Sequence, residues 1–182
     1  MPCGSYQHSR EEGNRKGIRI VKWTGVEAVK MEGGVEIADT VKGIVEAGVP
    51  VMGHLGLTPQ HINAFGGYGL RAKQEQEAER LITDAKALEK AGVFGITLEK
   101  IPAPLASRVT KELQVVTIGI GAGNGTDGQI LVYADALGMT QGFKPKFLRH
   151  FADVRACMQA GVKEYITDVK DSSFPNAEES YD

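Results

Sequence analysis

Residues 75–99, EQEAERLITDAKALEKAGVFGITLE, hold the pattern that decides the fold. Apolar residues recur at helical spacing from Ala78 to Leu88, with acidic residues before them and lysines near the end, which suits the helix dipole. Gly92 provides a left-handed helix end, and the continuous apolar run 93–98 predicts a buried strand. A helix joined by glycine to a buried strand is typical of a βαβ unit.

The same arrangement recurs along the chain. Further helices are predicted from Ser9 to the residue before Gly25, over 37–48, from Pro102 through Leu113 and over 154–169, and further strands over 26–31, 49–53 and 115–120. We therefore predict an α/β fold with a parallel sheet. Only four strands are clear, whereas a closed (βα)8 barrel needs eight. An open doubly wound sheet and a partial barrel both remain possible.

The bulk properties exclude several classes of partner. The chain has 182 residues and a formal net charge of −2, which gives no reason to expect nucleic acid or an anionic membrane as a partner. It has no apolar run long enough to span a bilayer and no secretory signal. Cys3 and Cys157 make no disulfide framework. A cytoplasmic location is expected, with organelle targeting left open.

Polar residues gather where the predicted strands end, the edge at which parallel α/β folds bind ligands. Lys30 and Glu32 are two residues apart on one strand, so they share a face and suit a small anion plus a metal or water. The alternative is a structural ion pair between them. His54 follows the strand 49–53, and it is either a functional residue or a hydrogen-bonded structural one.

Glu99 ends the third strand, where a single carboxylate suits a general base. Its alternative is a surface pair with Lys100. Residues 119–128 form a glycine-rich turn without the spacing of the dinucleotide fingerprint, so the turn is either flexible or a close backbone approach to a ligand. The long segment 55–72 is a candidate lid.

Together these segments resemble the ketopantoate hydroxymethyltransferase family. The resemblance covers nearly the whole chain and rests on five motifs in the family's order: VKMEGG (29–34), GHLGLTPQ (53–60), FGGY (65–68), LEKIP (98–102), and IGIGAG with DGQ (118–123 and 127–129). The opening residues MPCGSY also match. The resemblance implies a (βα)8 barrel of the phosphoenolpyruvate/pyruvate type, here partial, with about three first βα units missing. We expect a partial barrel domain over 1–153 and a C-terminal helix with an acidic tail over 154–182.

The resemblance also implies a reaction and residue roles. The family transfers a hydroxymethyl group from 5,10-methylenetetrahydrofolate to 3-methyl-2-oxobutanoate, with Mg²⁺ chelating the keto acid, and its members form homo-oligomers. Glu99 matches the family's base, Lys30 the residue that binds the substrate carboxylate, Glu32 the acidic residue beside the metal, and His54 a pocket residue near the reacting carbon.

Several features depart from the family pattern. The two aspartates that hold Mg²⁺ in the family have no counterpart in this sequence, so we expect weak or no transferase activity from this chain. Gly69, Arg71 and Ala72 replace the family's usual residues, which predicts a looser lid segment. Two other functions stay open: a non-catalytic, truncated paralogue that assembles with full-length subunits, and a generic anion-binding α/β module.

Overall fold

The computed structural model describes residues 1–142 and 144–181. They form two compact units, Met1–Ile130 and Leu131–Asp182. This division by contacts falls earlier in the chain than the expected domain boundary at 153/154, which stays a prediction. All four candidate site residues lie in the first unit.

The first unit is built on a parallel sheet in which sequence neighbours are also spatial neighbours. Its strands, in the order β1-β2-β3-β4-β5, are β1 (Val29–Glu32), β2 (Val51–Gly56), β3 (Gly95–Glu99), β4 (Val116–Ile120) and β5 (Gly128–Gln129). A doubly wound sheet reverses its strand order at a switch point, whereas this order runs in one direction throughout the described residues. This order argues against the open doubly wound sheet, and it is compatible with the other alternative from the sequence, a partial barrel.

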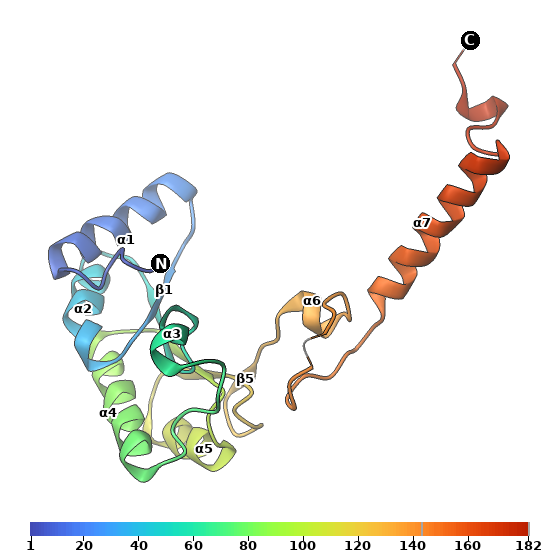
Figure 1. Cartoon of the computed structure of the whole chain (residues 1–182). Helices are drawn as coiled ribbons and strands as arrows, with labels where there is room; N and C mark the ends of the chain where they lie inside the picture. The colour runs from blue at the N-terminus through green and yellow to red at the C-terminus, as the bar shows by residue number, and fades with distance from the viewer. Residues whose placement is uncertain (143, 182) are drawn as a thin grey trace. The chain divides into compact units, whose positions relative to one another are not determined.

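The helices of this unit form a single layer. They are α1 (Arg10–Thr24), α2 (Ala38–Glu46), α4 (Glu75–Ala91) and α5 (Ala103–Glu112), and α1 contacts α2, α2 contacts α4, and α4 contacts α5. Figure 1 shows them side by side along the sheet. Right-handed crossovers between sequential strands place all connecting helices on the same face. The core lies between the helices and that face, and its fully buried side chains include Met31, Val41, Ile44, Val51, Leu88, Ile96 and Leu98.

The predicted start of α1 and the predicted ends of α1 and α4 are confirmed. The Ser9 hydroxyl accepts the backbone N–H of Glu12 at 3.2 Å, so Ser9 caps α1. Gly25 and Gly92 end α1 and α4 with φ values of 73° and 95°, the left-handed region that glycine adopts without a Cβ penalty. Helix ends are local features, and so they were visible in the sequence.

The predicted strand bounds were wrong by a few residues. β1 starts at Val29 rather than Val26, and β2 runs from Val51 to Gly56, so His54 lies within β2 rather than after it. The cause is pairing, because Val29 lies opposite Val51 and the ladder begins there. β5 was missed because a two-residue strand has no recognisable period.

The segment after β2 is tied at several points. It contains the short helices η2 (Pro59–His61) and α3 (Ile62–Phe65). The guanidinium of Arg71 stacks on Phe65, 4.0 Å from the ring centroid, and forms an ion pair with Glu77 at the start of α4. These ties run against the prediction that substitution at Arg71 loosens the lid.

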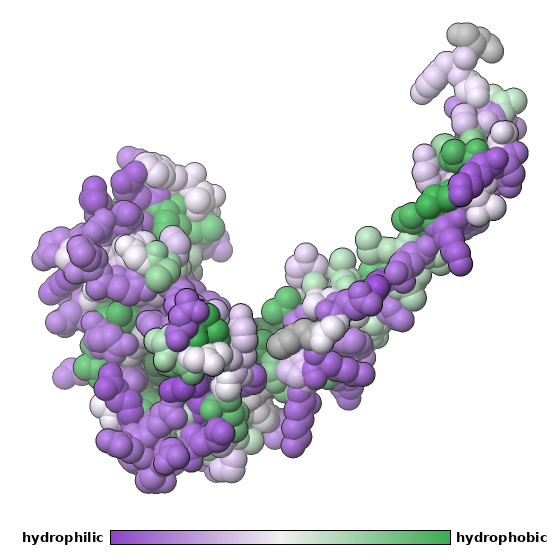
Figure 2. Space-filling view, viewed as in Figure 1, coloured by the Kyte–Doolittle hydropathy of each residue, from purple (hydrophilic) through white to green (hydrophobic). Residues whose placement is uncertain are grey.

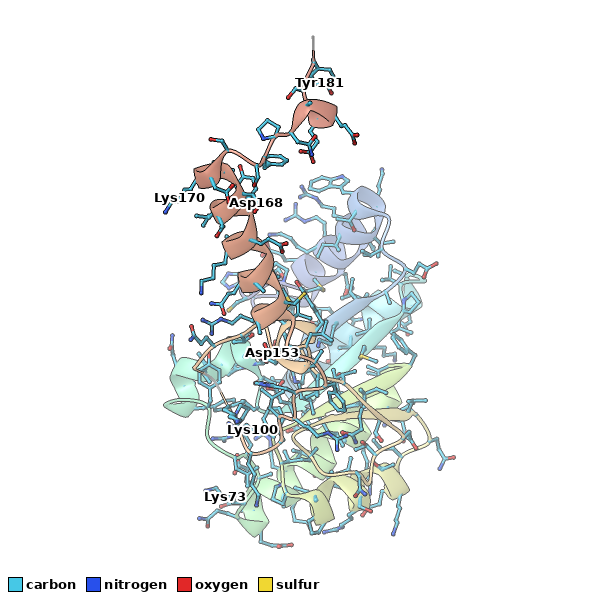
Figure 3. The ribbon with its side chains drawn as sticks, turned by 90° about the vertical axis from the view of Figure 1, so that its right-hand side faces the viewer. Lys73, Lys100, Asp153, Asp168, Lys170 and Tyr181 are labelled. Atoms are coloured by element: carbon cyan, nitrogen blue, oxygen red, sulfur yellow. The ribbon has the colours of Figure 1, made fainter. Side chains whose placement is uncertain are left out.

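The second unit contains α6 (Tyr133–Ala136), α7 (Val154–Asp171) and η3 (Ala177–Glu179). The Asp153 side chain caps α7 by accepting the N–H of Ala156 at 3.0 Å. No residue of α7 is buried within the second unit. Figure 2 shows hydrophobic and hydrophilic residues next to one another along this helix, and Figure 3 labels two of its charged residues, Asp168 and Lys170. Within the described part of the chain, no helix has the length and apolarity that crossing a membrane requires.

Candidate active site

The polar candidates share the face of the sheet opposite to the helices. Glu32 lies opposite His54 in the register between β1 and β2, and His54 lies opposite Thr97 on β3. Glu99 is two residues beyond Thr97, so it points to the same face. Gly53, by contrast, faces the helices, because a Cβ there would meet Leu88 of α4. The prediction that these side chains share one face is consistent with this geometry.

His54 lies between two carboxylates. Its Nε2 lies 3.1 Å from Glu99 Oε2, and its Nδ1 lies 4.0 Å from Glu32 Oε1. The residue is 2% exposed, and neither ring nitrogen has a partner with hydrogen-bond geometry among the described residues. A buried imidazole with two unbonded nitrogens is costly for folding, which favours a functional role over a structural one.

Glu32 is the last residue of β1 and is held in place by the segment after β2. It is 8% exposed, and its Oε2 accepts the backbone N–H of Gln60 at 2.9 Å. Its second oxygen faces His54. The carboxylate therefore has one oxygen fixed by the backbone and one directed into the site.

Glu99 is positioned by the turn that follows β3. Its side chain is 19% exposed, and its carbonyl oxygen accepts the N–H of Leu57 at 2.8 Å. The next residue, Lys100 (labelled in Figure 3), has a φ of 52°, and its ammonium group donates to the carbonyl oxygen of Tyr68 instead of pairing with Glu99. The alternative of a surface pair between Glu99 and Lys100 is therefore not formed.

Lys30 lies on the same face, two residues before Glu32 and opposite Met52 of β2. Its side chain is exposed, and in the described part of the chain it has no carboxylate within ion-pair distance. The structural ion pair with Glu32 is therefore absent. Lys30 is left as a free cation at the edge of the site.

The polar groups of the glycine-rich turn bond to the two strands that flank it, β4 and β5. Asp127 Oδ2 accepts the N–H and the hydroxyl of Thr117 at 2.8 and 2.9 Å, and these bonds lower the pKa of Asp127. The Gln129 amide donates to the carbonyl of Gly123 and the hydroxyl of Thr126. These bonds fix the turn between β4 and β5. Because its polar side chains already bond within the chain, the turn gives little support to the alternative of an anion-binding module.

A cavity of about 260 Å³ lies between the segment after β2 and the helix α4, and its lining includes Gly34, Thr58, Arg71 and Asp84. It contains none of Glu32, His54 and Glu99. The candidate site is therefore the sheet face opposite to the layer of helices rather than this cavity.

Two residues near the site were missed by the sequence analysis. Tyr6 and Gln60 both bond to Glu32, across 26 and 28 residues of chain. Both belong to motifs that were recognised as a whole, but no local pattern indicates contacts over such separations. The buried position of Tyr6, at 1% exposure, was equally invisible in a polar segment.

The fold and the site define an α/β protein with an acid–base cluster at the carboxyl ends of a parallel sheet. The chain belongs to the ketopantoate hydroxymethyltransferase family, whose sequence profile matches residues 1–177.

Its relatives carry the same description. The 3-methyl-2-oxobutanoate hydroxymethyltransferase of Bacteroides fragilis is 56% identical over 181 residues, that of Flavobacterium johnsoniae is 54% identical, and that of Phocaeicola vulgatus is 53% identical. Each comparison covers 100% of this chain and 66% of the relative, so the chain spans just under two thirds of their length.

Proposed function

We propose that this chain takes part in the transfer of a hydroxymethyl group from 5,10-methylenetetrahydrofolate to 3-methyl-2-oxobutanoate, giving ketopantoate for pantothenate synthesis. Family membership and the names of the relatives support the reaction class. The observation that carries the proposal is the approach of Glu99 to His54, 3.1 Å apart on the sheet face opposite to the layer of helices.

The proposed reaction forms one carbon–carbon bond. Glu99 removes the proton from C3 of the keto acid, and the enolate attacks the one-carbon unit of the folate. The carbon–nitrogen bonds to that carbon break, water supplies the new hydroxyl oxygen, and tetrahydrofolate leaves. Glu99 is suited to the first step because its carboxylate ends a strand and stays 19% exposed, so a bound keto acid can come within reach of it.

The other roles follow from position. Lys30 is a free cation at the edge of the site, and we assign to it the carboxylate of the keto acid. His54 borders the reacting carbon, and its Nε2 lies 3.1 Å from Oε2 of Glu99. Glu32 supports His54 from the opposite side.

Mg²⁺ is the metal that the family resemblance implies. A bound Mg²⁺ would polarise the carbonyl group of the keto acid. Among the described residues, no group of three or more histidine, cysteine or acidic side chains is placed to hold a metal ion. Glu32 offers a single free oxygen, whereas Mg²⁺ requires a near-octahedral set of oxygen ligands. The described residues therefore do not fit a complete Mg²⁺ site, and Glu32 is proposed only as one contributor to it.

Assembly and location are also proposals. The exposed apolar residues of α7 support a homo-oligomer, and the small substrates imply neither nucleic acid nor membrane as a partner. We propose a cytoplasmic protein. The alternative of a non-catalytic paralogue finds no support in the site, because Lys30, Glu32, His54 and Glu99 are all present and share one face.

A transfer assay tests the proposal. The purified chain, Mg²⁺, methylenetetrahydrofolate and the keto acid are incubated, and ketopantoate is quantified beside the Bacteroides fragilis relative. We expect a rate above the protein-free blank but well below that of the relative, because the described metal ligands are incomplete. A wild-type rate equal to the blank would sink the proposed function. A rate equal to that of the relative would contradict the weak activity.

A further inference from the structure

The N-terminal segment covers the outer edge of β1. Val29 donates its N–H to Pro50 at 3.0 Å, and Gly33 donates to the carbonyl of His54 at 3.4 Å, so both face β2. Alternate residues of a strand direct their backbone groups to opposite edges. Glu32 therefore turns its N–H and C=O away from β2, and Tyr6 meets them there.

A single phenol satisfies both backbone groups. The N–H of Glu32 donates to the Tyr6 hydroxyl oxygen at 2.9 Å, and that hydroxyl donates to the carbonyl oxygen of Glu32 at 3.0 Å. The Tyr6 side chain is 1% exposed, so water has no access to replace it. The hydroxyl takes the place that a peptide group of a neighbouring strand would occupy, and it fixes the backbone at the end of β1.

Gln60 connects the same N-terminal segment to the Glu32 carboxylate. Its side-chain amide donates to the carbonyl oxygen of Met1 at 3.0 Å, and its side-chain oxygen accepts from Gln7 at 3.0 Å and lies 3.3 Å from the Tyr6 hydroxyl. Its backbone N–H donates to Glu32 Oε2 at 2.9 Å. A side chain with two bonds to one segment, to Met1 and Gln7, leaves its own backbone N–H little freedom to move.

We propose that Tyr6 and Gln60 are positioning residues that together hold the Glu32 carboxylate beside Nδ1 of His54. Tyr6 fixes the backbone of Glu32, and Gln60 fixes one carboxylate oxygen, so the other oxygen is directed at the imidazole. Neither residue touches the reacting atoms. The inference rests on the proposed function only for the part that Glu32 and His54 play in the reaction.

Nitrogen NMR of the imidazole rings in the full 182-residue chain tests the proposal. Glu32→Gln measures how strongly the carboxylate affects the His54 Nδ1 signal, and His54→Gln assigns that signal. We expect Tyr6→Phe and Gln60→Met to move the Nδ1 signal in the same direction as Glu32→Gln. Tyr133→Phe is the matched control, because Tyr133 is 72% exposed, and it should leave His54 unchanged.

Three outcomes would overturn the inference. The first is folded Tyr6→Phe and Gln60→Met variants with an unchanged His54 signal, since their contacts would then be structural only. The second is a Glu32→Gln variant that itself leaves Nδ1 unchanged. If Tyr6→Phe does not fold, Gln60→Met alone tests the inference. The third outcome is then an unchanged His54 Nδ1 signal in Gln60→Met. A chain that shows these shifts but no ketopantoate formation keeps the positioning inference and loses the proposed function.

Discussion

At the scale of single residues, the chemistry of the site depends on two carboxylates that form no ion pair with a described lysine. Glu99 and Glu32 approach His54 from opposite sides, at 3.1 and 4.0 Å. Lys100 is bonded to the backbone of Tyr68, and Lys30 is exposed. No described lysine therefore competes for the two carboxylates, so they remain available to His54 and to a substrate.

Tyr6 gives a prediction about alkaline pH. Burial raises the pKa of Tyr6 from 10.0 to about 12, with the hydrogen bond to the Glu32 backbone acting in the opposite direction. Below pH 10 both the folded and the unfolded chain keep the phenol proton. Between about pH 10 and pH 12 only the unfolded chain loses it, so the free energy of unfolding falls by up to ~1.4 kcal/mol per pH unit.

Urea unfolding of the wild type and of Tyr6→Phe measures this effect. The measurements run from about pH 8 to just above the pKa of about 12 that Tyr6 has in the folded chain. We expect the stability advantage of the wild type over Tyr6→Phe to shrink above pH 10, because the variant has no proton to lose at this position. A difference between the two chains that stays constant up to pH 12 would contradict the burial and bonding of Tyr6.

At the scale of elements, the strand ends are fixed by close backbone contacts. Gly56 ends β2 with a φ of 88°, and a Cβ at Gly56 would collide with the carbonyl oxygen of Glu99. The N–H of Leu57 donates to that same oxygen at 2.8 Å. The end of β2 and the turn that carries Glu99 therefore fit together only when residue 56 is glycine.

Gly56→Ala should destabilise the chain by about 2–4 kcal/mol, through left-handed strain and the collision together. Gly161→Ala is the matched control, because Gly161 lies within α7 with nothing within 4 Å of its Cβ position. There we expect a gain of about 0.5–1 kcal/mol in helix stability, measured by thermal unfolding. Equal effects of the two substitutions would show that the contact between Gly56 and Glu99 is not formed.

The elements also show what the sequence could predict. The ends of α1 and α4 depend on Ser9, Gly25 and Gly92, whose effects are local, and they were predicted correctly. The strand starts depend on pairing between Val29 and Val51, which no local pattern contains. The bonds from Tyr6 and Gln60 to Glu32 are likewise long-range, so they appear only in the folded chain.

At the scale of the whole molecule, strand order argues against one of the two architectures that the sequence left open, the doubly wound sheet. The order β1-β2-β3-β4-β5 places one layer of helices on one face of the first unit and leaves the other face for polar side chains. A (βα)8 barrel has the same division between an outer ring of helices and an inner face whose strand ends carry the site. Helix and strand patterns alone could not supply that order.

The second unit gives a prediction about assembly. The helix α7 has no buried residue, and the exposed apolar residues of this helix are Met158, Val162, Tyr165, Ile166 and Val169. Because a helix gains most of its stability from packing an apolar face, we expect α7 to be covered by another copy of the chain in solution. Light scattering should give an oligomer for the wild type and a smaller species for Val162→Lys.

Lys163→Ala, one residue along the same helix, is the control for that measurement, because it changes charge without adding one to the apolar face. It should leave the oligomer intact. A monomeric wild-type chain across the micromolar range would contradict assembly through α7.

The central claim is that Glu99, which lies 3.1 Å from His54 on the sheet face opposite to the layer of helices, removes a proton from a small keto acid. Exchange of the C3 hydrogen of 3-methyl-2-oxobutanoate with deuterium, followed by proton NMR in D₂O without folate, isolates that step. We predict exchange above the protein-free rate for the wild-type chain, and a rate about 10²–10⁴-fold lower, or equal to the blank, for Glu99→Gln. Equal exchange by the wild type and Glu99→Gln would contradict the assignment of Glu99 as the base.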